Sequence, residues 1–182
     1  MWFPARSAMR ESIRAEALNC RVYSVYKKLG MPPKSTLKIK VKYMGEVKTR
    51  VLLRNYVSVG ASKRGYLSEK DIESSELDMI VDTGAVMILL PQDEVEKLGL
   101  EPSKKVVVTY ADERKEERWV AKGVEVTIGN RSMVTDCIIG PPLCEPLLGQ
   151  LVLEELDLIV DASRKTLGPR PESPNLPLLK LK

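Results

Sequence analysis

The chain has 182 residues, 43% of them hydrophobic, which suffices for one globular domain with a buried core and additional tails. Its net charge of +4 is unevenly distributed, because residues 1–44 carry ten lysines and arginines against two glutamates while the remainder is mildly acidic. Histidine is absent, which excludes Ser-His-Asp and Cys-His catalysis and HExxH zinc sites.

The cysteines and the hydropathy pattern exclude further classes of protein. Cys20, Cys137 and Cys144 form an odd set without CxxC spacing, so neither a disulfide framework nor a zinc site is predicted. No run approaches the ~20 apolar residues of a membrane span, and the first residues lack the apolar segment of a secretory signal. We therefore expect a soluble cytoplasmic protein with no membrane partner.

Residues 1–43 are predicted to be a basic N-terminal extension. Residues 7–28 have the spacing of an amphipathic helix, and residues 38–42 alternate like an edge strand. An alternative is that translation starts at Met44, where the charge changes sign. A basic segment can bind nucleic acid, but this one has no interleaved aromatic residues and no nucleic-acid motif, so nucleic acid is not the expected partner.

From residue 47 onward the sequence is typical of short β-strands separated by turns. Two short helices interrupt them, one starting near Pro91 and ending before Gly99, and one near residues 151–156. Residues 170–182 form a proline-rich tail that is expected to be extended. The expected strands are residues 51–53, 77–81, 87–90, 106–110, 119–128, 133–139 and 158–160.

Asp82, Thr83 and Gly84 follow a strongly apolar strand. The pattern predicts a carboxylate on a tight turn at the end of a buried strand, with glycine allowing close backbone approach. Peptide hydrolysis without a metal or a covalent nucleophile needs two carboxyl groups that share one proton. One accepts a proton from water while the other donates to the carbonyl oxygen.

Three features together resemble the retropepsin-like aspartic proteases, in particular their small prokaryotic stand-alone members. They are residues 80–85 followed by Leu-Leu-Pro at 89–91, a hairpin at about 110–119, and Pro-Leu-Leu-Gly at 146–149 before a short helix. The resemblance covers about residues 47–169. It implies a single-lobed, all-β, closed acid-protease barrel with one or two short helices in a domain of residues 44–169.

The resemblance also implies roles for particular residues. Asp82 would be the catalytic carboxylate, Thr83 would link the two catalytic loops of a homodimer, and Gly84 would allow close backbone approach. The hairpin tip would be a flap over a peptide or protein substrate, although it lacks the glycines common in such flaps. No metal or organic cofactor is implied. The expected substrate-binding residues are Ala85, Tyr110, Ala111, Asp112 and Glu113.

The second carboxylate is expected from a second chain. Asp161 also follows an apolar strand, but it lacks a following Thr-Gly pair and is predicted to be a turn aspartate. Two other classes of function stay open. One is a catalytically silent dimeric module that binds peptides with the same barrel, and the other is a nucleic-acid-associated protein that acts through its basic segment.

Overall fold

The computed structural model describes residues 46–179. The helix expected at residues 7–28, the strand expected at 38–42 and the alternative start at Met44 lie outside the described residues. Within the described part of the chain, no helix has the length and apolar character needed to cross a membrane.

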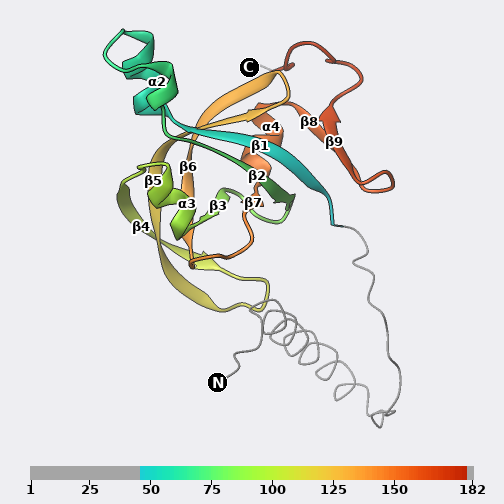
Figure 1. The fold of residues 1–182 in the computed structure, drawn as a ribbon. Coiled ribbons are helices and arrows are strands. Elements are labelled where there is room, and N and C mark those ends of the chain that lie inside the picture. Colours follow the sequence, from blue (N-terminus) through green and yellow to red (C-terminus); the bar gives the residue numbers. More distant parts are fainter. Residues whose placement is uncertain (1–45, 180–182) are drawn as a thin grey trace, which may run out of the picture. The chain divides into compact units, whose positions relative to one another are not determined.

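The described domain is built around one sheet that closes on itself (Figure 1). Its strand order is β1-β2-β7-β3-β6-β5-β4, and β1 also pairs with β5, so six strands form a ring and β4 extends outward as the partner of β5. The expected all-β fold with a single lobe is confirmed. The strands are β1 (Lys48–Asn55), β2 (Ser74–Val81), β3 (Ile88–Pro91), β4 (Pro102–Thr109), β5 (Lys115–Ile128), β6 (Arg131–Gly140) and β7 (Leu147–Leu148).

The interior of the ring is filled by alternate side chains of its strands. Because successive side chains of a strand point to opposite faces, every second residue of β1 enters the core, as with Val51 and Leu53. Met79, Leu90 and Leu148 meet them from β2, β3 and β7, and all five side chains are fully buried. Burial of each such side chain stabilises the fold by about 1.5–3 kcal/mol, so the ring is a packed core.

Short helices lie on the outside of this ring (Figure 1). The expected helices correspond to α3 (Gln92–Lys97), followed by Gly99 at a φ of 61°, and to α4 (Gln150–Glu155). A helix that was not predicted, α2 (Tyr56–Lys63), follows β1 and leads to a short 3-10 helix, Glu69–Asp71. Asn55 caps α2, because its Oδ1 accepts from the backbone N–H of Val57 at 2.9 Å.

The C-terminal part packs against the ring as a separate two-stranded sheet. The strand expected at 158–160 is β8 (Leu158–Asp161), but it pairs with β9 (Thr166–Pro169) and not with the main sheet. Arg131 is buried and donates to the carbonyl oxygens of Leu156 and Asp157 at 2.5 and 2.8 Å, and to that of Ser173. The described residues of the proline-rich tail are therefore tied to the domain.

Candidate active site

Asp82 is held at the end of β2 by strands on both sides. Its backbone N–H donates to the carbonyl oxygen of Leu148 at 3.0 Å, which fixes it to β7, parallel to β2 at this point. The preceding Val81 donates to the carbonyl oxygen of Val47 at 2.9 Å. Asp82 is half-buried, so its backbone is anchored in the sheet while its carboxylate reaches the surface.

The residues after Asp82 turn the chain tightly around its carboxylate. The backbone N–H of Gly84 donates to Asp82 Oδ1 at 2.9 Å, and that of Ala85 donates to the Asp82 carbonyl oxygen at 3.2 Å. A side chain at position 84 would crowd this arrangement, because a Cβ there would lie 3.2 Å from Asp82 Oδ1. Thr83 and Gly84 are both exposed. The turn thus orients one carboxylate oxygen and presents its tip to solvent.

Gly149 allows the start of α4 to pack directly on this turn. Gln150 donates its backbone N–H to the Ala85 carbonyl oxygen at 2.7 Å, and Leu151 donates to that of Val86 at 3.1 Å. A Cβ at position 149 would lie 2.6 Å from the carbonyl carbon of Met87 and 2.8 Å from the Val86 oxygen. The Leu-Leu-Gly element at residues 147–149 therefore lies beside the Asp82 turn.

β4 and β5 form a long hairpin with a short tip. Their pairing continues to Thr109 and Lys115, so the tip comprises residues 110–114. The second strand of the hairpin was expected to start at residue 119, but residues 115–118 already belong to β5, where charged side chains alternate between its two faces. Glu113 adopts a φ of 65° and donates its N–H to the Tyr110 carbonyl oxygen at 2.9 Å. A charged residue thus occupies the left-handed position that glycine usually takes in such turns.

Contacts between charged and aromatic side chains stabilise the tip of the hairpin. Arg114 Nε donates to Asp112 at 2.7 Å, and this hydrogen bond lowers the pKa of Asp112. The Arg114 guanidinium also lies over the Tyr110 ring, 5.3 Å from its centre. The Tyr110 hydroxyl donates to Glu116 at 3.2 Å and accepts from Arg118 Nε at 3.2 Å. The tip lacks glycine and is cross-linked by these contacts.

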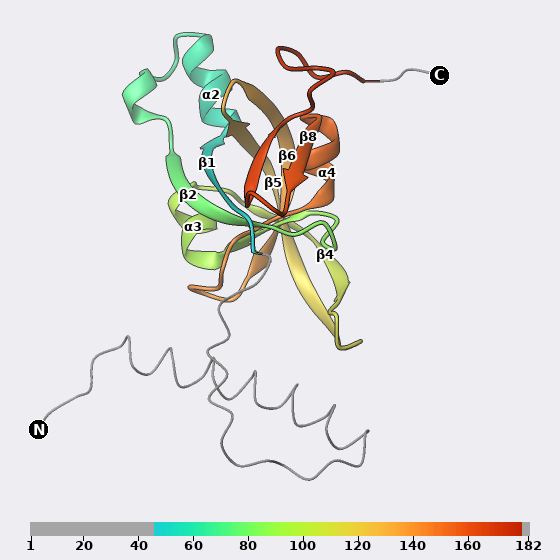
Figure 2. The same ribbon diagram turned by 90° about the vertical axis from the view of Figure 1, so that its right-hand side faces the viewer.

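The hairpin and the Asp82 turn project from the same side of the domain. Figure 2 shows the loop after β2 and the β4–β5 hairpin extending in the same direction, and α2 at the opposite end.

The Asp82 turn, the hairpin and α4 lie in one continuous segment of the sequence. A family model described as a gag-polyprotein putative aspartyl protease matches residues 69–155, which include β2, the Asp82 turn, the hairpin and α4. This match supports the resemblance of this part of the chain to the retropepsin-like aspartic proteases.

Two solved structures are similar to the chain. The EIAV protease complexed with the inhibitor HBY-793 is 16% identical, with 67% of this chain and 94% of that chain covered and a TM-score of 0.42. A retropepsin-like aspartic protease from Rickettsia conorii is 20% identical, with 66% and 79% covered and a TM-score of 0.40. A comparison with curated protein sequences gave no match.

In the described domain the predicted site residues form two groups. Asp82, Thr83, Gly84 and Ala85 make up one turn, and residues 110–113 form the greater part of the hairpin tip. Asp161 belongs to neither group, because its Oδ1 accepts from the backbone N–H groups of Ser163 and Arg164, each at 2.9 Å. The prediction that it is a turn aspartate is confirmed.

An exposed apolar residue of the Asp82 turn and one of the loop before β7 were not singled out from the sequence. Val86 lies in the Asp82 turn and is 71% exposed, and Leu143 precedes β7 and is 69% exposed. Leu143 adopts a φ of 60° and donates its N–H to Asp93 Oδ1 at 2.8 Å. Val86 thus presents an apolar side chain to solvent in the same turn as the Asp82 carboxylate. The only sequence signal for Leu143 was the preceding Pro-Pro pair, which indicates a turn.

Proposed function

We propose that the protein is an aspartic endopeptidase that acts as a homodimer, with Asp82 of each copy contributing one carboxylate. The observation that carries this proposal is the Asp82 turn. Its carboxylate is half-buried at the end of a buried strand, one of its oxygens accepts the Gly84 N–H at 2.9 Å, and the following Thr83 and Gly84 are exposed. The turn is therefore available for contact with an equivalent turn of a second copy.

The chemistry explains why a second copy is needed. Water attack on a peptide bond requires a base that takes the proton of the water and an acid that protonates the carbonyl oxygen. Two carboxyl groups that share one proton supply both functions, because like charges a few ångströms apart do not both ionise. Asp82 and Asp161 both follow an apolar strand, but Asp161 Oδ1 accepts hydrogen bonds from the backbone N–H and the hydroxyl of Ser163 in its own turn. Of these two aspartates, each copy of the chain therefore supplies one catalytic carboxylate, that of Asp82.

The substrate would bind as an extended strand between the hairpin and the Asp82 turn. Extended peptides are recognised through their backbone, while their side chains alternate between subsites. Val86 offers an apolar contact in the Asp82 turn, and the hairpin tip with Tyr110 would lie over the peptide. This arrangement favours cleavage next to apolar residues.

Incubation of the purified protein with a diverse peptide mixture, followed by mass spectrometry, tests the proposal. We expect internal cleavage that pepstatin inhibits and that Asp82→Asn abolishes without loss of folding. Cleavage that persists in Asp82→Asn would contradict the assignment of Asp82. Peptide binding without cleavage by the wild type would identify the catalytically silent module instead. Salt-sensitive retention on RNA or DNA, lost when residues 1–43 are removed, would identify the nucleic-acid-associated alternative.

A further inference from the structure

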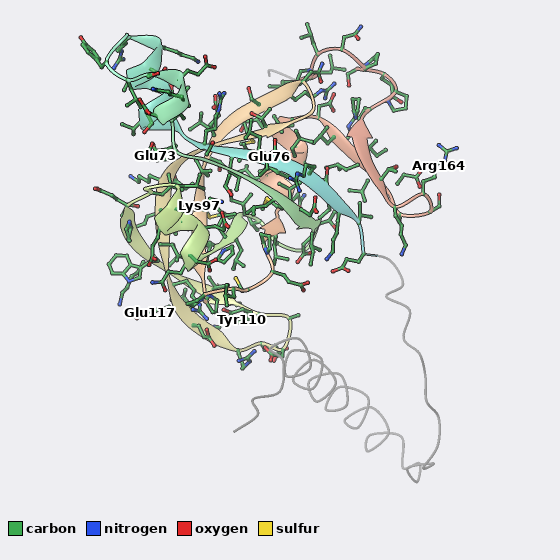
Figure 3. The ribbon with its side chains drawn as sticks, viewed as in Figure 1. Glu73, Glu76, Lys97, Tyr110, Glu117 and Arg164 are labelled. Carbon is green, nitrogen blue, oxygen red and sulfur yellow. The ribbon has the colours of Figure 1, made fainter. Side chains whose placement is uncertain are left out.

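The two faces of the β4–β5 hairpin carry two different ion pairs. Cross-strand pairing places Glu116 opposite Val108 and Arg118 opposite Val106, and these side chains share one face with Tyr110. Lys105 and Glu117 form a second pair on the opposite face, with Nζ and Oε2 3.0 Å apart. Figure 3 shows Tyr110 and Glu117 on opposite sides of the hairpin. We call the face with Tyr110, Glu116 and Arg118 the inner face.

The inner-face pair is the more shielded of the two. The side chains of Arg118 and Glu116 are 25% and 37% exposed, whereas those of Lys105 and Glu117 are 52% and 67% exposed. A charge pair that is shielded from water interacts more strongly with an additional charge than a pair in free solvent does. Of the two pairs, the one on the inner face is therefore better placed to recognise a charged group.

The β5 segment that carries Arg118 lies beside the loop before β7. Val120 pairs with Ile138 in antiparallel register, so Arg118 lies level with Gly140 at the end of β6, and a Cβ at Gly140 would lie 2.6 Å from Cys144 Sγ. Cys144 belongs to the loop before β7, and in that loop the carbonyl oxygen of Pro146 accepts from Ile80, two residues before Asp82, at 3.0 Å. The inner face of the hairpin and the Asp82 turn thus border the same loop.

The hydrogen bonds of the inner face favour an incoming acid over an incoming base. Glu116 contacts Arg118 at 2.5 Å, Tyr110 at 3.2 Å and Arg114 at 3.6 Å. If Arg118 turned to a new carboxylate, Glu116 would keep Tyr110 and Arg114, so no buried charge would be left without a partner. A basic side chain that approached Glu116 would instead meet two guanidinium groups of its own sign.

We propose that Arg118 is a specificity-determining residue that selects peptides with an aspartate or glutamate close to the scissile bond. The inference rests on the proposed peptidase site and defines its substrate class. An acidic side chain would form a charge-assisted hydrogen bond with the guanidinium, while an apolar neighbour would contact Val86. A single bond of this kind corresponds to about tenfold in kcat/KM.

The test uses two peptides that differ only in one residue near the cleaved bond, glutamate in one and glutamine in the other. The measured quantity is the ratio of kcat/KM for the acidic peptide to that for the amide peptide. We expect a ratio of about ten for the wild type and a ratio near one for Arg118→Gln. Glu116→Gln removes the competing carboxylate and should raise the ratio. Lys105→Gln on the outer face is the matched control and should leave the ratio as in the wild type.

Binding of the same two peptides to Asp82→Asn, measured by fluorescence anisotropy, separates this inference from the proposed function. If the wild type cleaves neither peptide but Asp82→Asn binds the acidic one more tightly, the peptidase proposal fails and the role of Arg118 stands. If both peptides are cleaved at equal rates, or if Arg118→Gln keeps the wild-type ratio, the inference is overturned. If neither peptide is bound or cleaved, both proposals fail.

Discussion

Gly149 and Met87 approach so closely that no side chain fits between them. A Cβ at position 149 would lie 2.6 Å from the carbonyl carbon of Met87, a separation that real side chains do not show. Since Gln150 and Leu151 bond to Ala85 and Val86 at the same place, the contact joins the start of α4 to the Asp82 turn. It thereby couples the core of the domain to the proposed reactive group.

Substitution of Gly149 by alanine should displace this turn. We expect Gly149→Ala to lower the free energy of unfolding by about 1–3 kcal/mol, as for other overpacked sites, and to reduce peptidase activity in the surviving folded protein. Urea denaturation and initial-rate assays measure the two effects. Gly168→Ala in β9 is the matched control, because a Cβ there meets nothing within 4 Å. Equal behaviour of the two variants would contradict the packing argument.

Glu113 adopts an unfavourable backbone conformation at the tip of the hairpin. Because a residue with a Cβ is strained at a φ of 65°, Glu113→Gly should stabilise the tip by about 1–2 kcal/mol. Hydrogen exchange of the hairpin amides should then slow, and the free energy of unfolding should rise. Ala111→Gly, at a position without positive φ, should have the opposite effect. Faster hydrogen exchange of the hairpin amides in Glu113→Gly would show that the contacts of the Glu113 side chain stabilise the tip by more than its backbone strain destabilises it.

Asp157 should make the free energy of unfolding of the domain depend on pH under acidic conditions. The Ser173 hydroxyl, the backbone N–H of Leu178 and the guanidinium of Arg170 hold the pKa of this carboxyl below its usual range. A carboxyl with a lowered folded-state pKa stabilises the fold above its unfolded pKa, and this stabilisation is lost as pH falls through the folded value.

Urea midpoints measured from neutral pH down to pH 3 test this dependence. The decline in acid should be shallower for Asp157→Asn than for the wild type. Ser173→Ala removes the largest contribution to the lowered pKa, so the decline in acid should be smaller and should end at a higher pH than in the wild type. Identical pH profiles for the wild type and both variants would exclude Asp157 as a source of acid sensitivity.

Cys144 should react with thiol reagents well before Cys137. Burial raises the pKa of Cys137 to about 12, so its thiolate is scarce at neutral pH, and its side chain is fully buried. Cys144 is half-exposed in the loop before β7. Timed alkylation of the native protein, followed by peptide mass spectrometry, gives the order of labelling. Faster labelling of Cys137 would show that the ring opens locally around β6.

Local patterns predicted most of the individual elements. Alternation of Val124, Val126 and Ile128 with polar residues indicated a strand with one buried face, and all three are buried in β5. The turn at Asp82 followed from Asp-Thr-Gly after an apolar strand. Gly99 ends α3 as expected, because its φ of 61° suits glycine.

Other features depend on contacts that a local pattern does not contain. Closure of the ring needs the pairing of β1 with β5, as in Leu53 with Val126, residues far apart in sequence. α2 has one buried residue, Val59, so its apolar periodicity is weak, and β9 contains the glycine and proline that usually interrupt strands. The network of Tyr110, Glu116 and Arg118 became visible only once the register of β4 and β5 was known.

The most direct test of the central claim is the activity of mixed dimers of wild type and Asp82→Asn. After subunit exchange at equal amounts, random assembly leaves about a quarter of the dimers with both aspartates. Native mass spectrometry of differently tagged subunits establishes that exchange has occurred. If one active site needs two copies of Asp82, total activity should fall to about half of what the wild-type share alone gives, provided the subunit affinities match. Activity that stays at the full wild-type share after proven exchange would mean that each copy works alone and would contradict the account.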